Sequence, residues 1–289
     1  MSHMKISQIL SQRSSGYSFE FFPPRTEKGA RTLRNNLRLL ENYDPLYVSM
    51  TCGAGGSSQD KTLDAVDILL RESDFTVMPH LTSLQAAGSD ITRVLDGYRT
   101  RGIENIMALR GDPPEGVEGF NFLGQEFSYA VDLVRFIRER GDFCMGVAVY
   151  PEGHIESASF DRDIEHTIAK INAGAKFAVT QMFFDNSYFY RFHDTLRARG
   201  VNIPILPGIL PLTDISKVKK FASVCKATIP ARTEEQLGGL RDKPDEMKQR
   251  GIEFTIAQCR DLQQHGFERL HFFTLNKPDV IGRVLEGLR

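Results

Sequence analysis

The stretch that decides the fold is "FCMGVAVY" at residues 143–150, followed by "FDRDIEHTIAKINAG" at residues 160–174. The first part is a short apolar run bounded by polar sequence, which is typical of a buried strand. The second part has helical period, because its apolar residues are spaced by fours and a three along one stripe: Phe160, Ile164, Ile168 and Ile171. Gly174 then ends the helix. A strand followed by a helix is the unit that the rest of the chain repeats.

Eight such units follow one another. The predicted strands cover residues 17–22, 46–51, 76–82, 105–110, 143–150, 177–183, 203–208 and 269–275. The predicted helices cover residues 28–43, 58–72, 89–101, 125–140, 160–173, 186–199, 214–227 and 277–288. This order predicts α/β architecture, most simply a single (β/α)8 TIM barrel over residues 1–289, with a doubly wound open sheet as the alternative.

Two segments lie outside this repeat. Residues 230–266 hold extra charged helical sequence, which we interpret as an insertion between strands seven and eight of the barrel. Residues 1–15 form an N-terminal extension, and its first four residues, "MSHM", resemble the remnant of a tag. Neither segment predicts a second domain.

The composition excludes several classes of protein. Charged residues make up 25 % and hydrophobic residues 41 % of the chain, and the net charge is −1, which favours neither nucleic acid nor a membrane surface as a partner. No apolar run approaches the roughly 20 residues of a spanning helix, and the N-terminus lacks a signal-peptide pattern. The four cysteines form no C-x-x-C pair, so we expect no disulfide framework, no metal site and a cytoplasmic location.

Polar residues recur where the predicted strands end. In a parallel barrel the carboxyl ends of the strands carry the chemistry, so these side chains are expected to converge on one pocket. They are Glu20, Thr51, His80, Arg110, Asp112, Tyr150, His154, Gln181, Thr274, Asn276 and Lys277.

Glu20 is the most informative of these residues. It lies in "YSFEFFPPRT" at residues 17–26, among phenylalanines that predict burial. A buried carboxylate without a partner costs several kcal/mol, so burial is expected to raise its pKa and make it a general acid near neutral pH. Taken singly, Glu20 is as often a solvated residue, His80 more often a structural histidine, and Asp112 a residue that shapes a turn.

A second polar group lies on the helix predicted after strand five. Asp163, His166 and Lys170 are spaced by three and four, so they share one helical face. This face is either a solvated surface or a binding surface for the ribose and phosphates of a nucleotide. The glycine-rich "CGAGGSS" does not complete a dinucleotide fingerprint, since Ser58 takes the place of its third glycine. Walker A, G-x-S-x-G and H-E-x-x-H motifs are missing as well.

Eight motifs carry a resemblance to a known family. In chain order they are "SFEFFPPRT", "VSMTCGAGG", "PHLT", "ALRGDPP", "VYPEGH", "VTQMFFD", "PGILP" and "HFFTLN". Together they resemble the methylenetetrahydrofolate reductases of the catalytic-barrel type, and they cover essentially the whole chain.

The resemblance implies a (β/α)8 barrel that holds FAD. NADH or NADPH reduces the flavin and leaves, and methylenetetrahydrofolate then binds and is reduced to 5-methyltetrahydrofolate, which supplies methionine synthesis. Such barrels associate, so a homo-oligomer is expected, without the regulatory domain of eukaryotic relatives. The choice between NADH and NADPH stays open.

The resemblance also implies roles for single residues. Glu20 matches the family's general acid, Asp112 an aspartate near the flavin and the pterin, and Arg110 and Lys170 would face the pyrophosphate. Cofactor binding is expected at Thr51, Cys52, Ala54, His80, Leu109, Arg110, Gly111, Asp112, Tyr129, Ala130, Tyr150, His154, Ser157, Asp163, His166 and Lys170. Substrate binding is expected at Glu20, Thr51, Asp112, Gln181, Ile215, Leu275 and Lys277.

Five positions depart from the bacterial pattern. Cys52 replaces a tyrosine, His166 and Ala169 replace an asparagine and an arginine, Ile215 replaces an aromatic residue and Lys277 an arginine. Two alternatives therefore stay open, a flavin-independent reductase of the same substrate and a barrel that binds folate or flavin without turnover. A Schiff-base aldolase would need a lysine inside a strand, and the predicted strands offer none.

Overall fold

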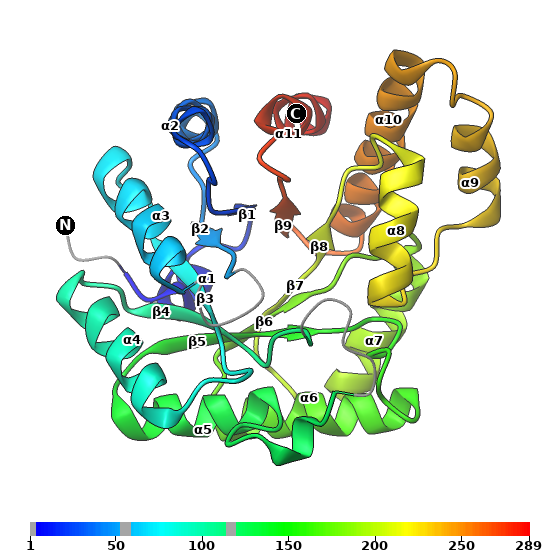
Figure 1. Ribbon diagram of the computed structural model, residues 1–289. Helices are drawn as coiled ribbons and strands as arrows, with labels where there is room; N and C mark the ends of the chain where they lie inside the picture. The colour runs from blue at the N-terminus through cyan, green and yellow to red at the C-terminus, as the bar shows by residue number, and fades with distance from the viewer. Residues whose placement is uncertain (1–3, 53–58, 114–119) are drawn as a thin grey trace.

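The computed structural model describes residues 4–52, 59–113 and 120–289. Within these residues nine strands, all parallel, form one sheet in the order β7-β6-β5-β4-β3-β2-β1-β9-β8 (Figure 1). Their bounds are β1 Gly16–Phe21, β2 Tyr47–Met50, β3 Val77–Thr82, β4 Asn105–Leu109, β5 Cys144–Val149, β6 Phe177–Thr180, β7 Ile205–Leu206, β8 Gly208–Ile209 and β9 Arg269–Phe273.

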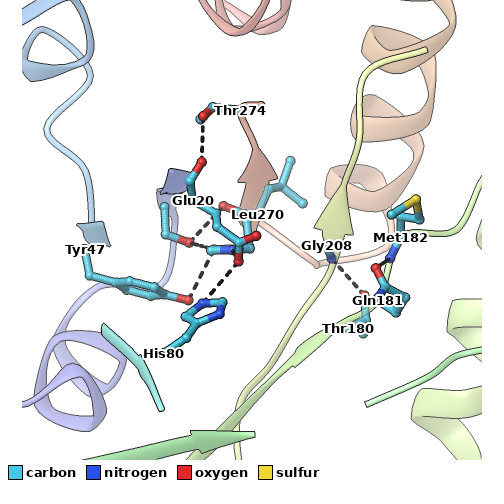
Figure 2. Close-up of polar contacts among 11 residues, drawn as sticks. Glu20, Tyr47, His80, Thr180, Gln181, Met182, Gly208, Leu270 and Thr274 are labelled. Carbon is cyan, nitrogen blue, oxygen red and sulfur yellow. Dashed lines mark hydrogen bonds and ion pairs between the residues drawn. The ribbon is translucent and has the colours of Figure 1, made fainter. Parts of the chain in front are cut away.

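The sheet closes through one short stretch of chain. β7 pairs with β6 and β8 pairs with β9, and only Pro207 separates the two strands in sequence. Proline has no N–H, so the ladder to β6 breaks there, and the Gly208 amide donates instead to Thr180 Oγ1 at 2.8 Å (Figure 2). A Cβ at Gly208 would overlap the Thr180 carbonyl oxygen, so this approach requires glycine. The barrel prediction is confirmed, and the open-sheet alternative is wrong.

Helices cover the outside of this barrel (Figure 1). They are α1 Ile6–Gln12, α2 Glu27–Glu41, α3 Gln59–Glu72, α4 Gly88–Thr100, α5 Ala130–Arg140, α6 Phe160–Ala173, α7 Asn186–Ala198, α8 Ile215–Cys225, α9 Ala231–Gly238, α10 Pro244–Gln264 and α11 Pro278–Leu288. The helix expected from residue 125 begins only at Ala130, because Tyr129 is extended and caps it, with its amide donating to Asp132 Oδ2 at 3.0 Å. The 3-10 turn η2, Phe122–Gly124, lies before this cap. Among the helices in the described ranges, none is long and apolar enough to cross a membrane.

The segment 230–266 is not simply an addition to the barrel. It forms α9 and α10, and α10 packs against both α7 and α11, which places it in the outer ring of helices. Its buried residues Ile252, Cys259 and Leu262 join the main core between strands and helices. The helix expected in that ring, α8, instead packs with α9 and the first turn of α10 in a separate apolar cluster.

The interior of the barrel is apolar at its amino-terminal end. Inward-facing residues of the strands form a layer there with Ile6, Ile9 and Leu10 of α1. The Ile6 amide donates to Asn105 Oδ1 at 2.7 Å, so α1 is bonded to the start of β4. The N-terminal extension therefore contains a helix that closes the floor of the barrel, which its sequence did not indicate.

Gly251 tests the place of α10 in the ring. A Cβ at this position would overlap the backbone carbonyl of Leu212, and backbone cannot move aside as a side chain can. We expect Gly251→Ala to lower the free energy of unfolding in urea by about 3 kcal/mol or more. Gly238→Ala on α9 is the matched control, since its Cβ would meet open space, and it should change stability by less than about 1 kcal/mol. Equal stability of the two variants would contradict this packing.

Candidate active site

A large cavity opens at the carboxyl ends of the strands, with a volume of about 1930 Å³. Most residues predicted for cofactor or substrate lie on its wall: Glu20, Thr51, Cys52, His80, Leu109, Arg110, Gly111, Asp112, Tyr129, Ala130, Tyr150, His154, Ser157, Asp163, His166, Lys170, Gln181 and Leu275. Ile215 and Lys277 do not line the cavity, and Ala54 lies outside the described residues. The polar residues predicted for function therefore gather at this opening, above the apolar floor.

Glu20 lies at the base of this cavity, between two histidines from other strands. Its Oε2 is 3.3 Å from His80 Nε2 of β3 and 3.5 Å from His271 Nε2 of β9. The Glu20 side chain is 12 % exposed and that of His271 is 0 % exposed. Figure 2 shows the Glu20 side chain pointing toward His80. The carboxylate is therefore buried but has partners on two sides.

His271 was not among the predicted site residues. Its other ring nitrogen, Nδ1, lies 2.9 Å from Ser18 Oγ and 3.5 Å from the Tyr47 hydroxyl. The register of the sheet explains this grouping, because Ser18 pairs with Tyr47 on one side and with His271 on the other. A histidine inside the buried strand "RLHFF" carries the same kind of signal as Glu20, an ionisable side chain among apolar residues.

The pKa of Glu20 corrects the expectation from sequence. Burial is the largest influence and raises the pKa, but the charges and hydrogen bonds of His80 and His271 together outweigh it. The net effect lowers the pKa of the carboxyl from 4.5 to about 2. Glu20 is thus ionised in the free protein, and the expected raised pKa is wrong because two imidazoles, which lie far from Glu20 in the sequence, reach it from the nearby strands β3 and β9.

The turn after β9 holds the end of β1 in place. Thr274 Oγ1 donates to the Glu20 carbonyl at 2.6 Å, and the Asn276 side-chain amide both donates to and accepts from the backbone of Phe22. Leu275 and Asn276 have φ of 47° and 56°, a left-handed conformation that is costly for leucine. The clamp supports this strained turn and keeps the Leu275 side chain on the cavity wall.

Cationic groups lie on the opposite wall. Lys170 of α6 donates to the Ala148 carbonyl at 2.6 Å, and burial lowers its pKa to about 8 against the opposing pull of Asp163. Asp163 accepts a bond from Ser157 through Oδ1 at 2.9 Å, while its buried Oδ2 has no hydrogen-bond partner among the described residues. The predicted polar stripe on this helix therefore faces the cavity, since Asp163, His166 and Lys170 all line it.

Arg110 also lies on this wall and forms a two-bond ion pair with Glu156, a residue that sequence reasoning did not select. Two aromatic pairs border the same region, Tyr129 with His166 and Tyr150 with His154. Burial lowers the pKa of His154, which favours its neutral form. This arm of the cavity thus combines cations, flat rings and an unpaired carboxylate oxygen.

The remaining wall belongs to β6 and α8. Gln181 follows β6, and its Oε1 accepts a bond from the Met182 amide at 2.9 Å (Figure 2). Ile215, the expected substrate contact, is buried in the cluster between α8, α9 and α10. Phe221 on the same helix instead lines the cavity and is 43 % exposed, so it is the aromatic ring that this helix presents.

The fold is an α/β barrel, and the cavity lies at the strand ends, where barrels of this kind place the side chains that bind small molecules. The family model described as methylenetetrahydrofolate reductase matches residues 5–289, and the chain belongs to this family.

Named relatives agree with this assignment. Methylenetetrahydrofolate reductase (NADH) 1 of Arabidopsis thaliana is 37 % identical, over 94 % of this chain and 48 % of that protein, so the chain spans about half the length of this relative. The 5,10-methylenetetrahydrofolate reductase of Escherichia coli is 36 % identical, over 91 % of this chain and 87 % of that protein.

A solved structure shares the fold. It is an uncharacterized protein from Clostridium thermocellum, described as binding two copies of 5-methyl-5,6,7,8-tetrahydrofolic acid, with a TM-score of 0.65, 14 % identity and coverage of 98 % of both chains. At this identity the likeness concerns the fold alone.

The ionisation of Glu20 can be measured directly. We expect its carboxyl carbon, labelled with ¹³C and assigned by its loss in Glu20→Gln, to show no titration between about pH 4 and pH 8. His80→Ala should raise the pKa, because burial is then opposed by His271 alone. A carboxyl that titrates near about pH 6 in the unmodified protein would show that the histidines do not outweigh burial.

Proposed function

We propose that the chain reduces 5,10-methylenetetrahydrofolate to 5-methyltetrahydrofolate, with electrons from NADH or NADPH that pass through bound FAD, in one-carbon metabolism. The observation that carries this proposal is the Glu20 carboxylate, held between His80 and His271 at the base of the cavity. Family membership supports the reaction, and the name of the Arabidopsis thaliana relative supports NADH as one donor. Homo-oligomerisation stays a prediction.

The cation-lined wall fits FAD. Arg110 and Lys170 carry positive charge toward a pyrophosphate, which cationic donors bind well. The unpartnered Oδ2 of Asp163 can accept a bond from a ribose hydroxyl. The exposed face of Tyr129 offers a surface for an aromatic ring. FAD, when bound, would accept a hydride from the nicotinamide and deliver one to the folate.

The proton chemistry belongs to the opposite wall. The five-membered ring of the folate opens when one of its two nitrogens takes a proton and its bond to the bridging methylene carbon breaks. The electron pair of that bond stays on the protonated nitrogen. The methylene carbon and the other nitrogen then form an iminium cation, which a hydride can reduce. Because the pKa of Glu20 is lowered in the free protein, we assign the proton to the group formed by Glu20, His80 and His271, of which Glu20 and His80 lie on the cavity wall.

Three further residues are placed to handle the folate. The Asp112 carboxylate lines the cavity and would favour the iminium cation by its charge. Gln181 offers an amide that bonds only locally, to Met182, so it can exchange partners between folate and nicotinamide. Phe221 offers a ring face on which a pterin can stack.

Separate half-reactions test the role of Glu20. We expect Glu20→Gln to slow methylenetetrahydrofolate reduction by roughly 10²- to 10⁴-fold, because an amide cannot accept a proton and pass it on as a carboxylate can, while flavin reduction by NADH or NADPH is unchanged. Anaerobic stopped-flow absorbance of the flavin reports both steps. Glu27→Gln, an exposed carboxylate at the start of α2, is the control and should leave both rates unchanged. Folate reduction at the full rate in Glu20→Gln would remove Glu20 from the mechanism.

The proposed contact of Lys170 predicts a pH dependence. In the protein without cofactor the Lys170 ammonium has a pKa of about 8, and a bound pyrophosphate would raise this pKa. The charge on Lys170 therefore stabilises the complex fully below about pH 8, and this stabilisation is lost as the pH rises further. We expect the dissociation constant for FAD to increase above about pH 8, approaching tenfold per pH unit. Lys170→Arg should flatten this profile, because arginine does not titrate in this range. A flat profile in the unmodified protein would show that Lys170 does not face the pyrophosphate.

A further inference from the structure

Arg110 is held in one orientation by three groups. Its Nη1 and Nη2 donate to the two carboxylate oxygens of Glu156 at 2.6 and 2.8 Å. The guanidinium carbon lies 3.7 Å from the centre of the Phe122 ring, and Nε donates to the Gly111 carbonyl at 3.3 Å. The Arg110 side chain is only 13 % exposed. A long, flexible side chain is thus fixed at the wall of the cavity.

Glu156 is itself anchored. It lies in the loop after β5, and its amide donates to His154 Nδ1 at 3.1 Å. The hydrogen bond from Arg110 is the largest cause of a lowered pKa at the Glu156 carboxyl, so the pair is ionic. The loop that carries Glu156 also carries His154 and Ser157 of the cavity wall. The ion pair therefore ties this loop to the end of β4.

The geometry leaves part of the guanidinium available. Arginine has five N–H donors, and three are engaged by Glu156 and Gly111. We propose that Glu156 is a positioning residue that holds Arg110 so that its remaining donors meet the diphosphate of the cofactor. This inference rests on the proposed flavin function and deepens it, since Glu156 would act through Arg110 without touching the cofactor.

The opposite role, a carboxylate that competes with phosphate for Arg110, requires the arginine to leave Glu156 when the cofactor binds. That movement would break a bidentate ion pair and remove the guanidinium from the face of Phe122. Because the two remaining donors need no such movement, orientation is the role that the contacts favour.

A double-mutant cycle on FAD affinity tests the proposal. Quenching of flavin fluorescence gives the dissociation constant for the full chain, for Glu156→Ala, for Arg110→Ala and for the double variant. We expect Glu156→Ala to weaken FAD binding by roughly tenfold to a hundredfold, the effect typical of a group that orients a binding residue. In the Arg110→Ala background the same change should have no further effect, because Glu156 acts through Arg110. Glu253→Ala, which removes an exposed ion pair on α10, is the control.

Each other outcome is decisive. Tighter binding in Glu156→Ala would establish the competing role, and unchanged binding would show that Glu156 has no role toward the cofactor. If Glu156→Ala weakened FAD binding by the same factor in the Arg110→Ala background as in the unmodified protein, Glu156 would act independently of Arg110. Unmodified protein that takes up no FAD would overturn the flavin proposal as well, so the two failures can be told apart. Glu156→Gln, which keeps one acceptor oxygen, should bind FAD with intermediate affinity.

Discussion

The bond between the Gly208 amide and the Thr180 hydroxyl is the closure on which the rest of the molecule depends. Eight units of strand and helix can also form an open sheet, and an open sheet would leave two distant edges. Here Pro207 ends the pairing with β6 and directs the chain to β9, so both edges are joined through five residues, 205–209. Closure turns the strand ends inward, and residues more than 250 positions apart meet in one layer.

Closure also creates the electrostatic problem that the site solves. A carboxylate inside a barrel loses its water, and an unpaired one would cost several kcal/mol or take up a proton. Glu20 instead receives an imidazole from β3 and another from β9, and Ser18 and Tyr47 contact the far nitrogen of the second. The layer below is apolar and closed by α1, so among the described residues the Glu20 carboxylate meets water on its cavity side.

The local sequence pattern predicts those features that depend on residues close together in the chain. Apolar runs and helical period located the strands and helices, and a charge among phenylalanines identified Glu20. Neither pattern predicts contacts between strands that are far apart in the sequence. His271 and the direction of the pKa shift of Glu20 were therefore missed. The sequence placed α8 in the outer ring of helices, but α10 occupies that position. This placement depends on the close contact between Gly251 of α10 and the backbone of Leu212. The choice of Ile215 over Phe221 failed for a similar reason, because the buried face of α8 is set by α9 and α10.

The two walls of the cavity have to work at a distance from each other. Under the proposed function, proton chemistry would lie on β1, β3 and β9, whereas Arg110 follows β4 and Lys170 lies on α6. Carboxylates on the cationic wall offset its charge, since Asp163 lies near Lys170 and Glu156 neutralises Arg110. Under the proposed flavin function, the binding of a polyanion there then depends on the direction of individual donors as well as on their charge. This is the condition under which a residue such as Glu156, which orients a cation, matters.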